Sequence, residues 1–239
     1  MAMQPFGPAE KMQEAAGKLI QYFSEQGRPL VFTGLEKGFA DVLACYPAAS
    51  FTIESDRDNF DYVYLAEHLI SLSGRKLHSK KNHLNAFHKA NPQAQYLPIT
   101  ADIIPACRME LESWYALRIQ DEPDDPFIGW ERKAIMEIFD DYSYFGLQGG
   151  AILLDGRIIA FTFGEQLNEN TAVVHVEKAD PNIRGAYPAI NQAYVSSCWQ
   201  DMMYINREED MGHDGLRKAK ESYKPEKLIE KFNAQLIES

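Results

Sequence analysis

The stretch GGAILLDGRIIAFTFGEQL, residues 149–167, decides the fold of this chain. Two apolar runs flank Asp155-Gly156, and an Asp-Gly pair in that setting is the strongest short-range signal for a tight β-hairpin. A turn at 168–170 leads into a third run of strand-forming residues at 171–178. The pattern therefore predicts three consecutive antiparallel strands.

Helices and further strands extend outward from these three strands. Before them we expect a strand at 95–99, a helix that begins at Thr100 and a second helix at 129–142. After them we expect a helix at 185–199, a strand at 202–206 and a helix at 214–223. Residues 1–92 also alternate helix and strand, and we place a boundary near Asn91-Pro92. This order favours an α/β or α+β layered protein over a helix bundle.

Composition and charge narrow the class of protein. The 239 residues are 45% hydrophobic and 25% charged, which disfavours a disordered or fibrous chain. The net charge of −11 excludes nucleic-acid binding over the whole surface, and we expect no DNA partner. Three scattered cysteines disfavour a disulfide framework or a metal site. Without a secretory leader or an apolar run near the ~20 residues that span a bilayer, we expect a cytoplasmic protein.

Several segments resemble one family of bacterial proteins, which is related to the C-terminal catalytic part of phosphatidylglycerol lysyltransferase. These segments are DRDNFDYVYL (56–65), GRKLHSKKNHLNAF (74–87), GRIIAFTFGEQL (156–167), HVEKADPNIRGAY (175–187) and YINREEDMGHDGLRKAKESYKP (204–225). The element order is similar to that of the GNAT-type acyltransferase fold. The resemblance implies two GNAT-like domains in tandem, at 1–92 and 93–239, and a first domain that is incomplete because the chain enters it midway.

The same resemblance implies a reaction class. It implies an acyl or aminoacyl transferase that acts on an amine or hydroxyl acceptor, such as a small molecule or a lipid headgroup. The donor is then aminoacyl-tRNA or coenzyme A. A second hypothesis, from a different class, is a non-catalytic module that keeps the GNAT cleft to bind a ligand or a partner.

His175 and Glu177 are the first candidates for the chemistry. Strand alternation places both on one face of the predicted strand at 171–178. Polar groups on an apolar strand are costly to bury unless they are satisfied, and such a pair can position or deprotonate an amine. The alternative is that both side chains only form hydrogen bonds within the sheet.

A polar run follows the predicted strand at 202–206. The GNAT resemblance implies that this strand and the one at 171–178 splay apart and that the donor sits between them. Asn206 can then hold an amide, Glu208 or Asp210 can bind a cationic aminoacyl group or an amine, and Arg207 lies within the same run. The alternative is a solvated acidic turn paired with the basic residues Arg217, Lys218 and Lys220.

The start of the helix at 185–199 is the candidate site for coenzyme A. Backbone N–H groups at Gly185 and Ala186, together with Arg184, can receive a phosphate. The segment departs from the usual GNAT loop, because bulky Tyr187 and Pro188 follow its single glycine.

Residues 75–89 form a basic helix without any acid. Helical spacing groups Lys76, Lys80 and His83 into a candidate anion site for tRNA phosphate, a lipid headgroup or the phosphates of coenzyme A. The alternative is a solvated basic face, and the histidine spacing of five does not favour a metal. On the last helix, Tyr223 can protonate a leaving thiolate or alkoxide, a role that the GNAT resemblance implies, or it can simply pack.

Overall fold

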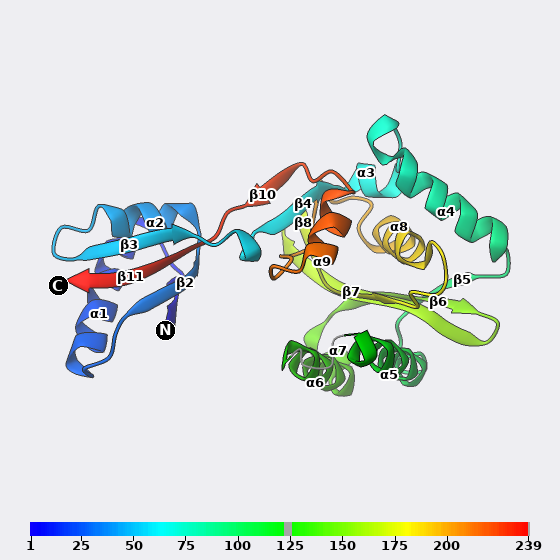
Figure 1. Cartoon of the computed structure of the whole chain (residues 1–239), viewed down its shortest axis with the longest axis horizontal. Coiled ribbons are helices and arrows are strands. Elements are labelled where there is room, and N and C mark those ends of the chain that lie inside the picture. The colour runs from blue at the N-terminus through cyan, green and yellow to red at the C-terminus, as the bar shows by residue number, and fades with distance from the viewer. Residues whose placement is uncertain (122–125, 239) are drawn as a thin grey trace. The chain divides into compact units, whose positions relative to one another are not determined.

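A computed structural model describes residues 1–121 and 126–238 of the chain (Figure 1). Two compact units form within it: a smaller one of Met1–Tyr62, Glu208–Lys220 and Lys227–Ser239, and a larger one of Val63–Arg207 and Glu221–Glu226. These units do not divide the chain at residue 92, because the segment after Tyr62 pairs and packs within the larger unit. The assignment of 1–92 and 93–239 as GNAT-like domains stays a prediction.

The smaller unit is built on a four-stranded sheet with the order β1-β2-β11-β3. Its core joins α1 and α2 to the sheet through apolar side chains such as Phe32, Leu35 and Phe39. Its elements are β1 (Ala2–Met3), α1 (Met12–Glu25), β2 (Val31–Leu35), α2 (Lys37–Ala44), β3 (Ser50–Ser55), α9 (Asp214–Glu221, whose last residue belongs to the larger unit), β10 (Lys227–Ile229) and β11 (Phe232–Glu238).

The larger unit contains the predicted antiparallel strands. Its strands run in the order β4-β9-β8-β7-β6-β5, and all neighbours are antiparallel except β8 and β9. The β6–β7 turn places Asp155 and Gly156 at φ 50° and 81°, so the predicted tight hairpin is confirmed. The strands are β4 (Asp61–Leu65), β5 (Gln95–Pro98), β6 (Gln148–Leu154), β7 (Arg157–Asn168), β8 (Thr171–Ala179) and β9 (Tyr204–Asn206).

Helices cover both faces of this sheet, as Figure 1 shows for α8 on one face and for α5 and α6 on the other. The α4 helix packs on α8, and α5 packs on β7 and β8. The helices are α3 (Ala66–Ser71), α4 (His78–Ala90), α5 (Ile104–Asp121), α6 (Pro126–Asp140), α7 (Tyr142–Phe145) and α8 (Ala186–Cys198). The predicted order of strand, two helices, three antiparallel strands, helix, strand and helix is present, with the short α7 added between α6 and β6.

Strands β8 and β9 pair over only three positions, from Thr171↔Tyr204 to Val173↔Asn206. Because β9 ends at Asn206, β8 continues from Val174 to Ala179 without β9 beside it. The splaying of the two strands stays a prediction. We call the region beyond this last pair the β8–β9 gap, and side chains fill it. Within the described residues no helix is long and apolar enough to cross a membrane, and all three cysteines are free thiols.

Glu110 of α5 is a buried acid that ties this helix to the sheet. The Arg157 guanidinium donates Nη1–H to Glu110 Oε2 over 3.0 Å and Nη2–H to Asp180 Oδ2 over 2.7 Å. Burial raises the pKa of Glu110 to about 7.

Replacing Glu110 by glutamine should change how stability depends on pH. The folded-state pKa lies above the ordinary 4.5, so the folded chain holds the proton more tightly, and wild-type stability falls as pH rises from 4.5 to about 7. We expect roughly 3 kcal/mol of unfolding free energy to be lost over that interval in the wild type and most of this loss to be absent in E110Q. Urea unfolding followed by tryptophan fluorescence measures it. Glu112→Gln, an exposed acid on the same helix paired with Arg132, is the matched control. Equal pH slopes in wild type and E110Q would contradict the prediction.

Candidate functional site

Glu177 lies at the centre of a polar cluster that spans the β8–β9 gap. Arg207, which directly follows β9, donates Nη2–H to Glu177 Oε1 over 2.9 Å. Asn191 of α8 donates Nδ2–H to Glu177 Oε2 over 2.7 Å. The Glu177 and Arg207 side chains are each 11% exposed, and Asn191 is fully buried. The carboxylate is therefore held by two donors from different elements.

Lys80 and Tyr223 complete this group, which we call the Glu177 cluster (Glu177, Arg207, Asn191, Lys80 and Tyr223). Lys80 Nζ lies 4.2 Å from the Tyr223 ring centroid, and the Arg207 guanidinium carbon lies 4.8 Å from it. Burial, and then the charge of Arg207, lower the pKa of Lys80, whereas Glu177 opposes that shift. Burial raises the pKa of Tyr223. The cluster thus holds two cationic groups, one carboxylate and a phenol.

Strand alternation explains why Glu177 reaches this cluster. Its neighbour Lys178 points to the opposite face, where Nζ contacts both carboxylate oxygens of Glu131 on α6 at 2.8 and 2.9 Å. The same ammonium lies 3.7 Å from the centroid of Trp114 on α5. Lys178 therefore ties β8 to the helical layer of α5 and α6 through an ion pair that is buried only on the lysine side.

His175 has a different partner from Glu177. Val174 and Val176 pair with the consecutive residues Gly164 and Phe163 of β7, so His175 is the extra residue of a β-bulge. Its Nε2 lies 3.1 Å from Glu165 Oε1, and the imidazole is 31% exposed. Gly164 permits this bulge, because a Cβ there would lie only 1.9 Å from the Val173 carbonyl oxygen. The sequence predicted that His175 and Glu177 act as one pair. In the structure His175 lies beside Glu165, whereas Glu177 binds Arg207 and Asn191.

The other residues of the polar run after β9 divide between the two units. Asn206 is buried in the larger unit, where its backbone is in register with Val63 of β4 and Val173 of β8. Glu208 and Asp210 belong to the smaller unit. The Glu208 carbonyl accepts from Lys220 Nζ over 3.1 Å, in line with the alternative hypothesis of a turn bound to basic residues of the last helix.

Asp210 has a full set of protein donors in the smaller unit. Its fully buried carboxylate accepts from Arg217 Nε at 2.9 Å and Nη2 at 2.8 Å, from the Tyr62 hydroxyl at 2.6 Å, from the Gly212 N–H at 2.9 Å and from Arg57 Nη1 at 3.3 Å. These hydrogen bonds hold the segment in place. The predicted role of Asp210 in binding a cationic aminoacyl group or an amine stays a prediction.

The predicted phosphate site for coenzyme A lies at the start of α8. Gly185 adopts φ 85°, and a Cβ there would lie 2.4 Å from the His83 carbonyl oxygen and 2.9 Å from Cβ of Phe87, both on α4. The Ala186 N–H already donates to the Ile183 carbonyl over 3.1 Å, and Arg184 is exposed. Because α4 covers Gly185, these residues do not fit a pyrophosphate cradle.

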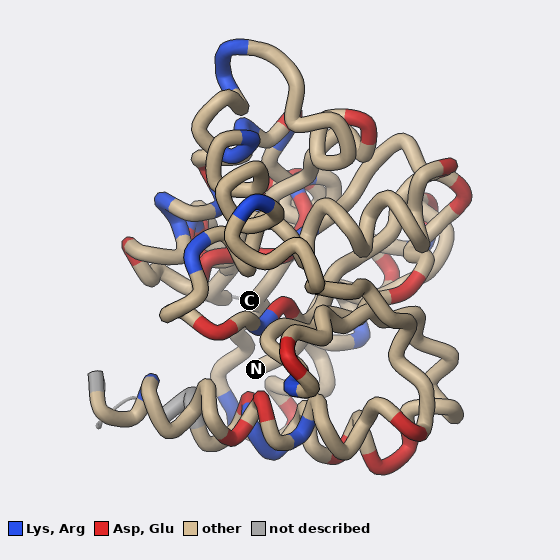
Figure 2. Tube along the Cα trace, turned by 90° about the vertical axis from the view of Figure 1, so that its right-hand side faces the viewer, with Lys and Arg blue, Asp and Glu red and all other residues tan. Residues whose placement is uncertain are grey.

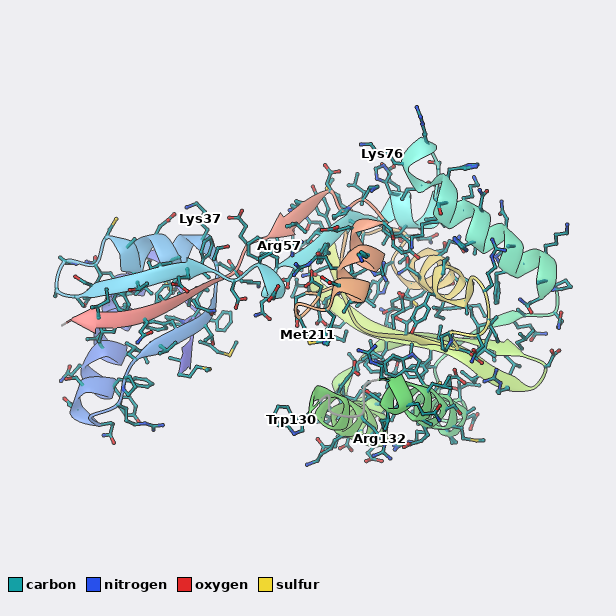
Figure 3. The ribbon with its side chains drawn as sticks, viewed as in Figure 1. Lys37, Arg57, Lys76, Trp130, Arg132 and Met211 are labelled. Carbon is teal, nitrogen blue, oxygen red and sulfur yellow. The ribbon has the colours of Figure 1, made fainter. Side chains whose placement is uncertain are left out.

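The basic segment is present as predicted, as a short 3₁₀ turn at Arg75–Leu77 that runs into α4. The 3₁₀ turn breaks the helical spacing, so Lys76 is exposed and points away from the fold whereas Lys80 turns inward (Figure 3). His83 contributes its backbone oxygen to the contact with α8. The exposed cations Arg75, Lys76, Lys81 and Lys89 lie within 4 Å of no acid among the residues that the structure describes. Figure 2 shows the lysines and arginines of the chain in blue and its acids in red.

Fold and site together define a class: an α+β protein with helices on both faces of a mostly antiparallel sheet and a buried carboxylate cluster where β8 has no β9 beside it. The chain belongs to the family described as phosphatidylglycerol lysyltransferase, C-terminal, whose model matches residues 1–235. The resemblance seen in the sequence is thereby confirmed.

Individual relatives agree with this assignment. A conserved protein of unknown function from Bacteroides thetaiotaomicron is 36% identical, with a TM-score of 0.88 over 98% of this chain and 78% of that chain. The C-terminal domain of a proposed lysylphosphatidylglycerol synthetase from Agrobacterium fabrum shares the fold, with a TM-score of 0.66 at 12% identity over 98% of this chain and 75% of that one. An uncharacterized protein of Mycoplasmoides gallisepticum is 27% identical over 74% of this chain, which spans only 56% of that protein.

Proposed function

We propose that this chain transfers an acyl or aminoacyl group to an amine or hydroxyl acceptor at the Glu177 cluster. The observation that carries the proposal is the Glu177–Arg207 contact across the β8–β9 gap, with Asn191 fixing the second carboxylate oxygen. Membership of the lysyltransferase family supports the reaction class. A held carboxylate beside two cations suits a reaction in which positioning and charge stabilisation supply most of the catalysis.

The cluster provides a role for each step of such a transfer. The acceptor oxygen or nitrogen bonds to the acyl carbon, while the bond from that carbon to the donor's leaving atom breaks. Glu177 takes the acceptor's proton, Tyr223 supplies a proton to the leaving atom, and exchange with solvent restores both groups. Arg207 and Lys80 stabilise negative charge on the acyl oxygen. His175 with Glu165 is the alternative base, and Asn206 orients the donor.

The proposal extends to domain organisation and location. We propose that the chain carries tandem GNAT-like domains, and that the second one holds the site. The short β8–β9 pairing and the order of elements around it support this assignment for the second domain. Free thiols at all three cysteines are in keeping with a reducing cytoplasm.

The donor we favour is aminoacyl-tRNA, and the acceptor a small molecule or a lipid headgroup. The α4 segment supports a phosphate-rich donor, because its outward cations have no acidic partner in the described part of the chain, while Lys80 of the same helix enters the Glu177 cluster. One helix can therefore hold the donor's phosphates and present its reactive end.

Changing Lys76 and Lys81 to glutamate should weaken binding of bulk aminoacyl-tRNA by at least tenfold. The slope of log K against log salt should also fall by roughly 1.5 to 2, because two phosphate contacts are lost. Filter binding at several salt concentrations measures both quantities. Lys133→Glu, an exposed lysine of α6, is the matched control and should change neither. An unchanged salt slope in the double variant would place the contact elsewhere.

A binding module without catalysis remains the second candidate, and one observation favours it: both Glu177 oxygens already accept from protein donors. The two functions separate in a single assay. Purified protein is incubated with labelled aminoacyl-tRNA and an amine or lipid acceptor, and donor consumption is compared with spontaneous hydrolysis. Binding without consumption, unaffected by Glu177→Gln and Asn206→Ala, supports the module.

A further inference from the structure

We infer that Trp114 and Tyr187 form a closure that fills the β8–β9 gap and excludes coenzyme A, so that the donor reaches the Glu177 cluster only from the side of α4. The inference rests on the proposed function, since it names the donor class of the same site.

The first argument is a hydrogen bond between helices on opposite faces of the sheet. Trp114 of α5 donates its Nε1–H to the hydroxyl of Tyr187, in the first turn of α8, over 2.9 Å. The α5 helix packs on one face of the sheet and α8 on the other. Side chains from the two layers can meet only where no strand intervenes, and β8 lacks a neighbour on that side beyond Val173. The pair therefore occupies the gap.

The second argument is that this closure is held rigidly. The buried Lys178 ammonium lies over the Trp114 ring at 3.7 Å and pairs with the half-exposed carboxylate of Glu131. Tyr115, beside Trp114 on α5, donates its hydroxyl proton to Glu131 Oε2 over 2.6 Å. Moving the Trp114 indole would therefore uncover the Lys178 ammonium and disturb its charged hydrogen bonds with Glu131, which opposes such a movement.

The third argument is the chemistry of coenzyme A itself. Its thiol ends a long, thin pantetheine arm that needs an open passage, and its pyrophosphate needs free N–H donors or cations. The aromatic pair fills the passage, and α4 covers Gly185 where the pyrophosphate would lie. An ester-bearing donor that approaches along α4 needs neither feature, because Lys80 already connects that helix to the cluster.

Isothermal titration with coenzyme A and acetyl coenzyme A tests the inference without any transfer step. We expect no saturable binding to the wild type at concentrations up to about 1 mM, and at least tenfold tighter binding to Tyr187→Ala or Trp114→Ala. Tyr187→Phe, which removes only the hydroxyl and keeps the ring, should behave like the wild type. Trp130→Ala and Tyr144→Ala are the matched controls, because both side chains are exposed on α6 and α7.

Each outcome is decisive. Saturable wild-type binding at any concentration up to about 1 mM overturns the exclusion of coenzyme A. If neither Tyr187→Ala nor Trp114→Ala binds any better than the wild type, while circular dichroism shows both variants folded, these side chains are not the closure. Binding of coenzyme A is measured directly, so the result can be interpreted even if the protein shows no transfer activity. Conversely, if Trp114 and Tyr187 do not exclude coenzyme A, the proposed role of Glu177 is not affected.

Discussion

Replacing Glu177 by glutamine should lower the rate of acyl or aminoacyl transfer by roughly 10²–10⁴-fold, the contribution that a positioned proton acceptor makes. Glutamine keeps the shape of the side chain, and its amide oxygen can still accept from one of the two donors, Asn191 or Arg207, but it cannot take a proton. Single-turnover transfer from labelled aminoacyl-tRNA is the measurement, because it separates chemistry from donor binding. Donor affinity should change far less than the rate.

Two controls keep that result interpretable. Removing the charge of Glu177 leaves Arg207 buried beside a neutral amide, so the variant will also be less stable, and its rate must be measured well below its melting temperature. Glu137→Gln, an exposed acid of α6, is the neutral control. Glu165→Gln tests the competing base. A large loss of transfer rate in E165Q with little loss in E177Q would show that His175, and not Glu177, accepts the proton.

The features that could be predicted from the sequence are those set by local patterns. Asp155-Gly156 fixes the hairpin because both residues tolerate positive φ, and the strands follow from their apolar runs. Strand alternation correctly separates Glu177 from Lys178, which lie on opposite faces of β8. The basic segment at 75–89 is helical over most of its length for the same local reason.

Side-chain partners from distant parts of the chain could not be predicted. A run of charges after a strand does not reveal that Arg57 will lie against Asp210, more than a hundred positions away in sequence. Asn191 gave a weak signal, as an amide in an apolar stretch of the helix at 185–199, but its partner Glu177 is visible only in the fold. Likewise, the 3₁₀ turn that separates Lys76 from Lys80 depends on the backbone at Gly74, which has φ 86°.

The Asp210 network offers the largest expected effect on stability. Its carboxylate is fully buried and bound by two arginines and a tyrosine, and Arg217 also donates to Asp58 over 2.6 Å. Burial alone would raise the pKa of Asp210, but the hydrogen bonds from Arg217, Tyr62 and the Gly212 N–H outweigh it and hold this pKa below the ordinary 3.8. The charged form is therefore the one that stabilises the smaller unit.

Asp210→Asn should destabilise the smaller unit by roughly 3–5 kcal/mol, because it leaves two arginines around a neutral amide. Asp58→Asn, which alters an exposed acid on the same Arg217, should cost only about 1 kcal/mol or less. All three tryptophans lie in the larger unit, so amide hydrogen exchange of peptides from 31–62 and 208–217 is the appropriate measurement. Because the folded pKa is depressed, the wild-type advantage over D210N should persist at neutral pH and shrink as pH falls below 3.8. Equal protection in D210N and D58N at pH 7 would show that the buried carboxylate does not hold this segment.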